Sequence, residues 1–417
     1  MSLKAKLKEI CSQDKGLALK ICVNAGLANA TPLYKFYKNP DKEMESFKVL
    51  LSIVRAVFES KEVSMMDSYI STLDPKKRTA RYCLEYTNMN NMTETKMSLI
   101  HKMLKCTNVE SKEWAKLYYI NHLSTYTALN EDDKLQVLTT LKEVTGEEYE
   151  VNEIFEGNSI LPATIEFLLD EVHPKSDEMK VFKGIEKMYC YYDVKNISAI
   201  EGFKKSVNVT LLKVTDEFMR DVLYCKLSLI SMGIALHTND ITKIRKNYEN
   251  IDRFQFDLDK AKYNLMLGNS YMFESYDKSY ELLCKALKYA YDSECEFRIT
   301  DTKRSINFLQ NYYNKTSLYI DSNSSAISDI HEYAFSLIRK NNPEGLRILE
   351  NMDLEKLTDH NKGFHFFLKG LATNNIEHFW TSIKSFNKTN EKYYKTITLI
   401  ELKKLGIENH ILDVMAV

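Results

Sequence analysis

Two stretches of the sequence repeat one pattern at a spacing that limits what the chain can fold into. They are YNLMLGNSYMFESYDKSYELLCKAL (263–287) and FHFFLKGLATNNIEHFWTSIKSF (364–386). In both, apolar residues at helical spacing flank a polar turn, and a glycine precedes that turn. These glycines, Gly268 and Gly370, are 102 residues apart, which is three times the period of about 34 residues known for stacked helical pairs. The pattern therefore predicts antiparallel helix pairs whose close approach the glycines allow.

The stretches between and before these two agree with repeats of the tetratricopeptide (TPR) type. HEYAFSLIRKNNPEGLRILENM (331–352) predicts another helical pair. RITDTKRSINFLQNYY (298–313) predicts the first helix of a pair. The pattern of the second helix is blurred by a polar stretch at 317–328. Gly233 stands 35 residues before the first of the two glycines, and the pattern is clear over 218–400. Each pair needs neighbours to bury its apolar face, so we expect a right-handed superhelical solenoid with a groove suited to extended peptides.

The N-terminal residues predict a different module. A helical pattern breaks at Gly26 in GLANATPLYKFY (26–37), after which Thr31 is a suitable N-cap and Pro32 suits a first helical turn. A strongly apolar helix follows at FKVLLSIVRAVF (47–58). Short helices around a glycine-containing turn are the outline of a helix-turn-helix. The alternative is an ordinary elbow in a helical protein.

Charge is distributed unevenly along the chain. The formal net charge is only -1, yet residues 1–38 hold seven lysines against two acidic residues, and KKRTAR (76–81) adds four positive charges. A basic end on an otherwise acidic chain indicates contact with a polyanion such as DNA at that end. The alternative is a lysine-rich helix that is only solvated.

Glycine (12) and proline (6) are scarce, which favours an all-α fold. We predict four parts: a helix-turn-helix DNA-binding domain (1–60), irregular TPR-like helical pairs (61–217), TPR-like repeats that form the groove (218–396), and a C-terminal capping or dimerisation segment (397–417). The acidic stretch 129–174 has no clear repeat and is interpreted as an insertion.

Motifs for catalysis are missing from the sequence. It contains no GxGxxG, no GxxxxGK[ST] and no HExxH. His331 and Glu332 are two adjacent residues without further ligands nearby in the sequence. We therefore favour a surface or groove position for them over a metal site. Eight cysteines form no CxxC pair and are expected to be reduced. The first residues, MSLKAKLKEI, do not resemble a signal peptide, and no run of about 18 apolar residues exists. We expect a cytoplasmic binding protein that is not an enzyme and uses no cofactor, metal or membrane.

Several segments resemble one known family. They are GLANATPLYKF (26–36), TARYCLEYTNMNN (79–91), NVESKEWAKLY (108–118), LGNSYMFESY (267–276), FHFFLKG (364–370), SIKSFNKTNEKY (382–393) and ELKKLGIENHILDVM (401–415). In this order they resemble the arbitrium receptors (AimR) of temperate Bacillus phages, which are peptide-sensing helix-turn-helix/TPR regulators. The resemblance covers most of the chain and is weakest over 120–215.

The resemblance implies a homodimeric transcription regulator of the lysis–lysogeny decision that takes part in quorum sensing in the bacterial host cell. Such receptors bind an inverted repeat in double-stranded operator DNA when no signal is present. A secreted peptide of about six residues then binds the solenoid groove and silences the receptor. In physical terms, peptide and operator prefer different arrangements of one flexible protein.

For DNA, the resemblance points to the turn and to the basic run. Asn29, Thr31 and Arg81 match polar or cationic positions of the family, whereas Ala28 stands where the family often has a lysine. Helical spacing adds Lys35 and Lys38. The predicted DNA-binding residues are Asn29, Thr31, Lys35, Lys38, Arg78 and Arg81. The alternatives are a helix-surface ion pair for Arg81 and mere solubility for the lysines.

For the peptide, Asn269 matches a groove asparagine that can clamp peptide backbone, and acidic positions could pair with a peptide arginine. The predicted peptide-binding residues are Asn269, Met272, His331, Glu332, His360, Glu391 and Arg253. The chain departs from the family pattern at Gly233, where an asparagine is expected, and at Leu258, where an arginine is expected. Arg253 supplies that arginine only if the match to the family contains a gap. Whether peptide sensing is retained therefore stays open.

The C-terminal segment is apolar at Leu399, Leu402, Ile411, Leu412 and Met415. The resemblance implies that these residues make the dimer, and the alternative is a cap that buries its own apolar face. Two other functions stay open: a TPR protein that binds other proteins and never touches DNA, and a paralogue that has lost its signal.

Overall fold

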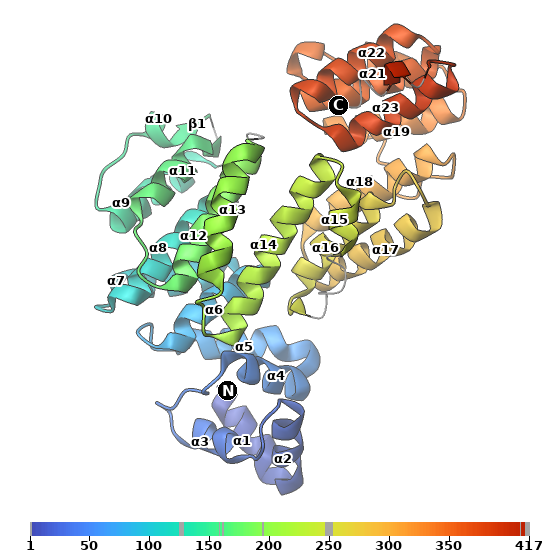
Figure 1. Cartoon of the computed structure of the whole chain (residues 1–417). Coiled ribbons are helices and arrows are strands. Elements are labelled where there is room, and N and C mark those ends of the chain that lie inside the picture. Colours follow the sequence, from blue (N-terminus) through green and yellow to red (C-terminus); the bar gives the residue numbers. More distant parts are fainter. Residues whose placement is uncertain are drawn as a thin grey trace. The chain divides into compact units, whose positions relative to one another are not determined.

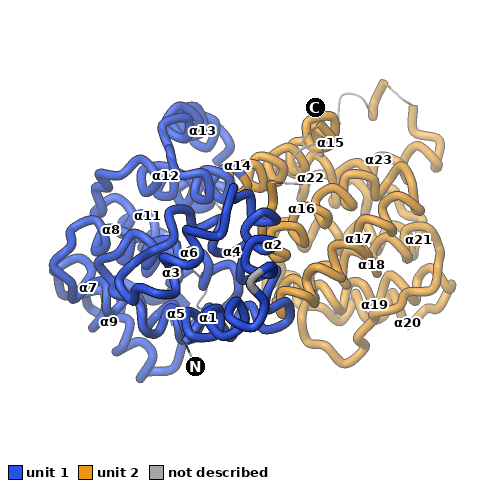
Figure 2. The backbone as a smooth tube through the Cα atoms, turned by 90° about the horizontal axis from the view of Figure 1, so that it is seen from below, with its two compact units in different colours: residues 1–224 blue, residues 225–417 orange. Residues whose placement is uncertain are grey.

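The computed structural model describes residues 2–124, 129–157, 159–160, 162–193, 196–246, 253–408 and 410–412, and most of these residues are in helices (Figure 1). The predicted all-α fold is confirmed. The strands among these residues are the two-residue β1 (Phe155–Glu156) and β2 (Ser159–Ile160), which pair antiparallel with Phe155 opposite Ile160. The chain divides into two compact units, Met1–Tyr224 and Cys225–Val417 (Figure 2).

The first unit is a bundle of short helices. In chain order they are α1 (Leu3–Gln13), α2 (Lys15–Asn24), α3 (Thr31–Lys38), α4 (Phe47–Phe58), the 3-10 turn η1 (Glu59–Lys61), α5 (Glu62–Ser71), α6 (Arg78–Met89), α7 (Thr93–Lys105), α8 (Val109–Leu123), α9 (Glu131–Thr145), α10 (Val151–Ile154), α11 (Pro162–Glu171), α12 (Asp177–Asp193), α13 (Ile197–Leu211) and the start of α14 (Glu217–His237). The stretch 129–174, expected to be an insertion, forms α9 to α11 and the small hairpin.

Three short helices follow each other at the N-terminus, as the sequence predicts for a helix-turn-helix. Asp14 caps α2, because its carboxylate accepts from the amides of Gly16 and Leu17. Gly26 has a φ of +81° in the turn, a conformation that favours glycine. One detail differs from the prediction. Thr31 is the first residue of α3 and does not cap it; the side-chain oxygen of Asn29 accepts the Thr31 amide instead.

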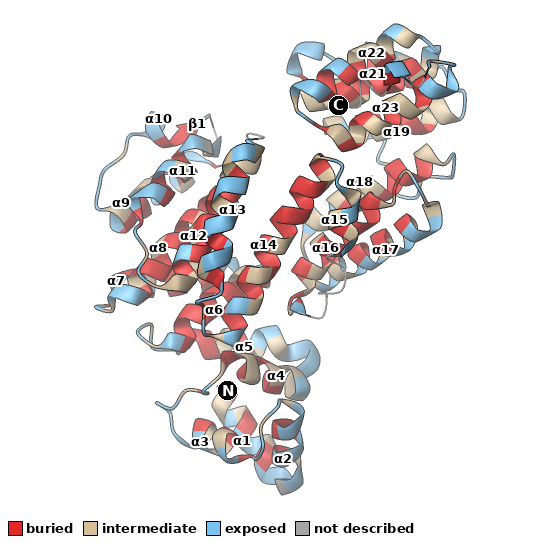
Figure 3. Cartoon of the chain, in the orientation of Figure 1, coloured by how far each residue is buried: buried red, intermediate tan, exposed pale blue. Residues whose placement is uncertain are grey.

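The second unit consists of helical pairs. Its helices are the end of α14, α15 (Ile241–Lys246), α16 (Asp257–Ser270), α17 (Tyr276–Asp292), α18 (Glu296–Tyr312), α19 (Ile327–Arg339), α20 (Glu344–Glu350), the 3-10 turn η3 (Leu354–Lys356), α21 (Asp359–Thr373), α22 (Ile376–Lys388) and α23 (Lys392–Lys404). The predicted pairs at 263–287 and 364–386 are α16–α17 and α21–α22. Each helix turns its apolar residues toward its neighbours (Figure 3).

The two repeat glycines lie where helices approach closely. A Cβ at Gly268 would come within 2.9 Å of Leu283, and a Cβ at Gly370 within 2.7 Å of the Phe379 ring. Ser279 also donates to the carbonyl oxygen of Gly268 at 2.9 Å across the first pair. The small residues therefore do what the repeat pattern predicts, which is to let the two helices of a pair touch.

The repeat is interrupted after α18. After α18, residues 314–326 are described and contain no helix, and the chain becomes helical again at Ile327. The segment expected to contain the blurred partner helix is thus non-helical and contains turns and bends. The predicted boundary at residue 217 also falls at the start of α14, whereas the two units divide inside that helix.

Candidate functional site

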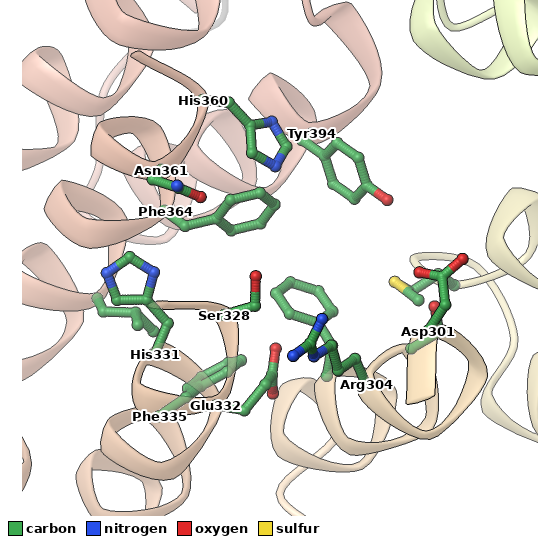
Figure 4. A pocket seen from close by; sticks show the side chains of 14 residues that line it. Asp301, Arg304, Ser328, His331, Glu332, Phe335, His360, Asn361, Phe364 and Tyr394 are labelled. Carbon is green, nitrogen blue, oxygen red and sulfur yellow. The ribbon is translucent and has the colours of Figure 1, made fainter. Parts of the chain in front are cut away.

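A cavity of about 190 Å³ lies inside the second unit. Three helices contribute residues at matching spacing, so that each presents one face to the cavity. Figure 4 shows Glu332 and Arg304 pointing into the space from one side and His360 and Phe364 facing them from the other. The lining residues are Asp301, Arg304, Ser305 and Phe308 of α18, Ser328, His331, Glu332 and Phe335 of α19, His360, Asn361, Phe364 and Leu368 of α21, Met272 and Tyr394.

Four of the seven predicted peptide-binding residues meet in this cavity: Met272, His331, Glu332 and His360. They come from segments almost 90 residues apart in the chain, so the fold brings them together. Asn269 and Glu391 are buried and do not line the cavity. Arg253 is exposed, precedes α16 and is not among the lining residues.

Glu332 is the carboxyl group of the cavity that has no basic partner within ion-pair distance among the described residues. Burial raises its pKa to about 8, although a hydrogen bond from Asn311 opposes that rise. The Asn311 amide donates to the Glu332 carboxylate at 3.1 Å. At neutral pH the carboxyl is therefore mostly protonated, and a cation that enters the cavity would favour its ionised form.

His331 presents a buried imidazole to the cavity. Only 5% of the residue is exposed, and its Nε2 has no hydrogen-bond partner among the residues that the structure describes. Burial, with a smaller effect of His365 and His360, lowers the pKa of His331 to about 3. Burial likewise lowers the pKa of His365, whose ring centroid is 5.7 Å away, to about 4. Both imidazoles are neutral at physiological pH, so His331 offers a hydrogen bond and no charge.

Glu391 reaches the cavity only through another residue. Its Oε2 lies 2.5 Å from Nδ1 of His360, and its Oε1 lies 3.9 Å from Nδ1 of His237. Only 5% of Glu391 is exposed. The carboxylate predicted to contact a peptide therefore holds the ring of His360, which does line the cavity.

Asn269 is anchored through its own backbone. Its carbonyl oxygen accepts a hydrogen bond from the hydroxyl of Tyr393, the neighbour of the lining residue Tyr394. The side-chain Oδ1 of Asn269 is buried and lacks a hydrogen-bond partner in the described part of the chain. A buried amide oxygen without a partner is costly, so this group is available to a ligand donor that reaches it.

Sequence reasoning missed the α18 face of the cavity. Arg304 makes a two-pronged ion pair with Asp329, at 2.6 Å from Nε and 2.9 Å from Nη2. This pairing lowers the pKa of Asp329. The spacing of Asp301, Arg304, Ser305 and Phe308 is that of one helix face and could have been recognised, but nothing in the local pattern shows which neighbours that face meets.

At the N-terminus, α3 exposes the side that was predicted to face DNA. Thr31, Lys35 and Lys38 are exposed, while Leu33 and Phe36 are fully buried. Asn29 is exposed as well, although its side-chain oxygen is engaged with the Thr31 amide at 2.9 Å. The exposed face of α3 is therefore polar and basic.

Lys4 of α1 forms hydrogen bonds with the segment that follows α3. Its Nζ donates to the carbonyl oxygens of Asn39, Pro40 and Lys42 at 2.7–2.9 Å. The same ammonium lies 4.6 Å from the centre of the Phe36 ring. These contacts hold α3 in one orientation on α1.

The two arginines of the basic run are engaged inside the first unit. Arg81 is 9% exposed and forms an ion pair with Glu110. Arg78 pairs with Asp216 at 2.9 Å and contacts the hydroxyl of Tyr82, with half of its side chain exposed. The ion pair considered as the alternative for Arg81 is thus present.

The C-terminal apolar residues differ in exposure. Leu402 and Leu412 are buried in the core of their own unit, and Leu399 packs against that core. Ile411 is 40% exposed. Met415 lies outside the described residues. Of the described members, Ile411 alone is exposed enough to meet another chain.

The described ranges also lack two other features. No group of three or more His, Cys, Asp or Glu side chains is arranged to hold a metal ion. None of the helices there is long and apolar enough to span a bilayer.

Comparison with known proteins relates the chain to regulators of Bacillus phages. The sequence model of the family described as AimR transcriptional regulator-like matches residues 62–167 and 162–404. The chain belongs to this family. The AimR transcriptional regulator of Bacillus phage SPbeta is 26% identical over 420 residues, 99% of each chain. This AimR-family chain is therefore a phage-type transcription regulator, and the SPbeta relative is named as a transcriptional regulator.

Two solved structures have the same fold. The structure of selenomethionyl phAimR matches with a TM-score of 0.75 at 24% identity and covers all of both chains. The structure named phAimR-Ligand matches with a TM-score of 0.68 at 22% identity and covers 88% of this chain and 99% of that one. The second name records that phAimR binds a ligand.

Proposed function

We propose that this AimR-family regulator acts in the host cytoplasm as a homodimer that binds an inverted repeat in operator DNA through α2 and α3. We further propose that a peptide of about six residues binds in and around the cavity of the second unit and switches DNA binding. The observation that carries the proposal is the convergence of Met272, His331, Glu332 and His360 on one cavity. As in the family, binding of the peptide and binding of DNA would then be coupled, and the same coupling free energy would act on both.

The DNA-binding part is supported by the exposed face of α3. Thr31, Lys35 and Lys38 are accessible, and Lys4 holds the helix in place. A helix that reads a major groove needs such a polar, basic and rigidly held face. Because Arg78 and Arg81 already have acidic partners within their unit, we centre the proposed contacts on Asn29, Thr31 and the two α3 lysines.

The test uses duplexes from the intergenic DNA on either side of the gene, titrated by fluorescence anisotropy at several salt concentrations. Replacing Lys35 and Lys38 together by Gln should weaken binding and reduce the slope of log K against log salt by about 1–2, because each lost phosphate contact reduces it by about 0.9. The matched control is Lys340→Gln with Lys403→Gln, which removes the same charge from exposed positions of the second unit. Absence of binding at low salt would refute the DNA-binding proposal.

The peptide part is supported by the chemistry of the cavity. It combines apolar walls with a protonated carboxyl at Glu332 and a neutral imidazole at His331 whose Nε2 has no partner among the described residues. Pockets with a few convergent polar groups on apolar walls are typical ligand sites. A peptide supplies the amide donors and carbonyl acceptors that such groups recognise.

Peptide binding is tested by thermal shift with a positional-scanning library of synthetic hexapeptides. The C-terminal hexapeptide of any short secreted reading frame beside the gene is included. A bound peptide should raise the melting temperature by an amount that grows with the logarithm of its affinity, and Glu332→Gln should reduce that shift. If no hexapeptide shifts the protein at high micromolar concentration, the peptide-sensing proposal is wrong.

The exposed residue Ile411 is the observation on which the proposed dimer rests, together with the family. Sedimentation velocity of the full chain and of Ile411→Glu tests it. A charge at this position should weaken a dimer that uses it, and a monomeric wild-type chain would contradict the proposal.

A second function is favoured by one observation. Leu19 and Val23 on α2 are 48% and 54% exposed, four residues apart on one face. Such side chains would mark a protein-docking site if they are part of a contiguous apolar patch. If intergenic DNA does not bind, a protein partner on α2 becomes the better proposal, and Val23→Ser should then abolish its capture.

A further inference from the structure

Residues 314–326, here called the strap, replace the helix that would pair with α18 and are fastened along one face of it. Asn307, Gln310 and Asn311 are buried and spaced as neighbours on that face. The Asn307 and Gln310 side-chain oxygens accept the backbone amides of Tyr319 and Leu318, at 2.9 and 3.0 Å. The strap is therefore held by side chains in place of a helical partner.

The first half of the strap is bonded to a residue that holds Glu332. Ser317 donates its hydroxyl to Oδ1 of Asn311 at 2.6 Å. The amide of the same Asn311 donates to the Glu332 carboxylate at 3.1 Å and to the Glu332 backbone oxygen at 3.2 Å. One buried asparagine thus joins the strap to the carboxyl group of the cavity.

The second half of the strap is bonded to a residue that holds Arg304. Ser324 donates to Oδ2 of Asp329 at 2.7 Å, and its own Oγ accepts the Ala326 amide at 3.2 Å. Asp329 holds the Arg304 guanidinium by two bonds, from Nε at 2.6 Å and from Nη2 at 2.9 Å. A second serine is therefore bonded to the residue that holds the arginine of the cavity.

We propose that the strap is a working part of the ligand site, in which Ser317 positions Glu332 through Asn311 and Ser324 positions Arg304 through Asp329. This inference rests on the proposed peptide-binding function and deepens it. Neither serine lines the cavity, so both are positioning residues. Peptide affinity then depends on a surface segment that the peptide does not touch.

The proposal has a reciprocal consequence. If an ordered strap strengthens peptide binding, a bound peptide must stabilise the strap by the same free energy. Exposed backbone amides of residues 314–326 should therefore exchange hydrogen more slowly when peptide is bound. Leu318 and Tyr319 of the strap are 56% and 37% exposed. A change in the conformation of the strap would therefore also change the exposure of these two side chains.

The experiment uses the full chain and matched serine variants. Ser317→Ala and Ser324→Ala each remove one hydroxyl of the strap, and Ser322→Ala and Ser325→Ala are the controls. The two control serines are exposed and make no hydrogen bond with any described residue. Ser317→Thr and Ser324→Thr retain a hydroxyl and serve as rescue variants. The probe is the synthetic hexapeptide that gives the largest thermal shift with the wild-type protein, and affinity is measured by calorimetry.

Ser317→Ala and Ser324→Ala should each weaken peptide binding by about three- to tenfold, which is the usual value of one hydrogen bond. The double variant should show the product of the two losses, because the serines act on different groups. The controls should stay within about twofold, the threonine variants should restore binding, and peptide should slow exchange in 314–326. Equal affinities in all four alanine variants, or an unchanged exchange rate, would overturn the inference.

A ligand-free measurement separates this inference from the peptide proposal. Phenylglyoxal modifies arginine side chains, and the rate at Arg304 can be followed by mass spectrometry in the free protein. Ser324→Ala should raise that rate several-fold and Ser322→Ala should not. An unchanged rate would overturn the role of Ser324 even if peptides bind. If no hexapeptide binds while the rate rises, the peptide proposal fails and the strap still positions Arg304.

Discussion

The carboxylate of Glu391 lies 2.5 Å from Nδ1 of His360. Because Glu391 is buried and His360 lines the cavity, we expect the two residues to act on a ligand as one unit. Glu391→Gln and His360→Gln should each weaken binding of the best hexapeptide by about three- to tenfold.

The double variant should be little worse than either single one, because a residue that acts through another has no separate contact to lose. Calorimetric titration of the four proteins measures this coupling. If the affinity lost in the double variant equals the product of the two single losses, Glu391 contacts the peptide directly.

Glu332 should make the stability of the second unit depend on pH. Burial raises its folded-state pKa to about 8 from a model value of 4.5. The unfolded chain therefore releases the proton at lower pH than the folded chain. The contribution of this carboxyl to the free energy of unfolding is complete below about pH 4.5 and is lost as the pH rises to about 8.

The measurement is the melting temperature of the wild type and of Glu332→Gln between pH 5 and 8.5. The wild type should lose several degrees more than the variant, at about 2–4 °C per kcal/mol for a unit of this size. Glu355→Gln, at an exposed position in η3, should follow the wild type. Parallel curves for wild type and Glu332→Gln would show that the Glu332 pKa is not raised.

Arg81 is expected to stabilise the first unit more than it contributes to DNA binding. It is buried and paired with Glu110, which is half exposed. Arg81→Ala should lower the free energy of unfolding by about 1–3 kcal/mol, because it removes both the ion pair and the packing of the side chain. Arg78→Ala removes a half-exposed pair with Asp216 and should cost less than about 1 kcal/mol.

Urea unfolding measures these losses, and anisotropy at a temperature where both variants are folded measures DNA binding. A large loss of DNA affinity in a fully folded Arg81→Ala protein, with unchanged stability, would return Arg81 to the proposed interface.

Gly370 should not tolerate a methyl group. The added Cβ would lie 2.7 Å from the Phe379 ring, closer than atoms in contact allow. Gly370→Ala should therefore cost about 1–3 kcal/mol through overpacking of the α21–α22 pair. Gly202→Ala is the matched control, because its Cβ would meet nothing within 4 Å and alanine stabilises a helix by roughly 0.5–1 kcal/mol over glycine. Equal effects of the two substitutions in thermal unfolding would mean that the close approach is absent.

Local pattern was sufficient for the architecture of the repeats. Helical period and turn residues are encoded over a few neighbours, so the pairs at 263–287 and 364–386 and the break at Gly26 could be predicted. The non-helical segment after α18 was not predicted, because the polar stretch 317–328 was interpreted as part of a blurred partner helix. The position of the N-cap at α3 was one residue off, because Ala30 is the N-cap and no side chain caps this helix; Asn29 accepts the amide of Thr31 instead.

The sequence by itself thus determined an all-α repeat protein of the AimR family and four residues that belong to one cavity. Only the tertiary structure decided that Arg304 faces the same cavity, that Arg81 is buried against Glu110, and that Glu391 acts through His360. The physical reason is that periodicity specifies which face of a helix is apolar, whereas burial, ion pairing and pKa depend on neighbours that are distant in the chain.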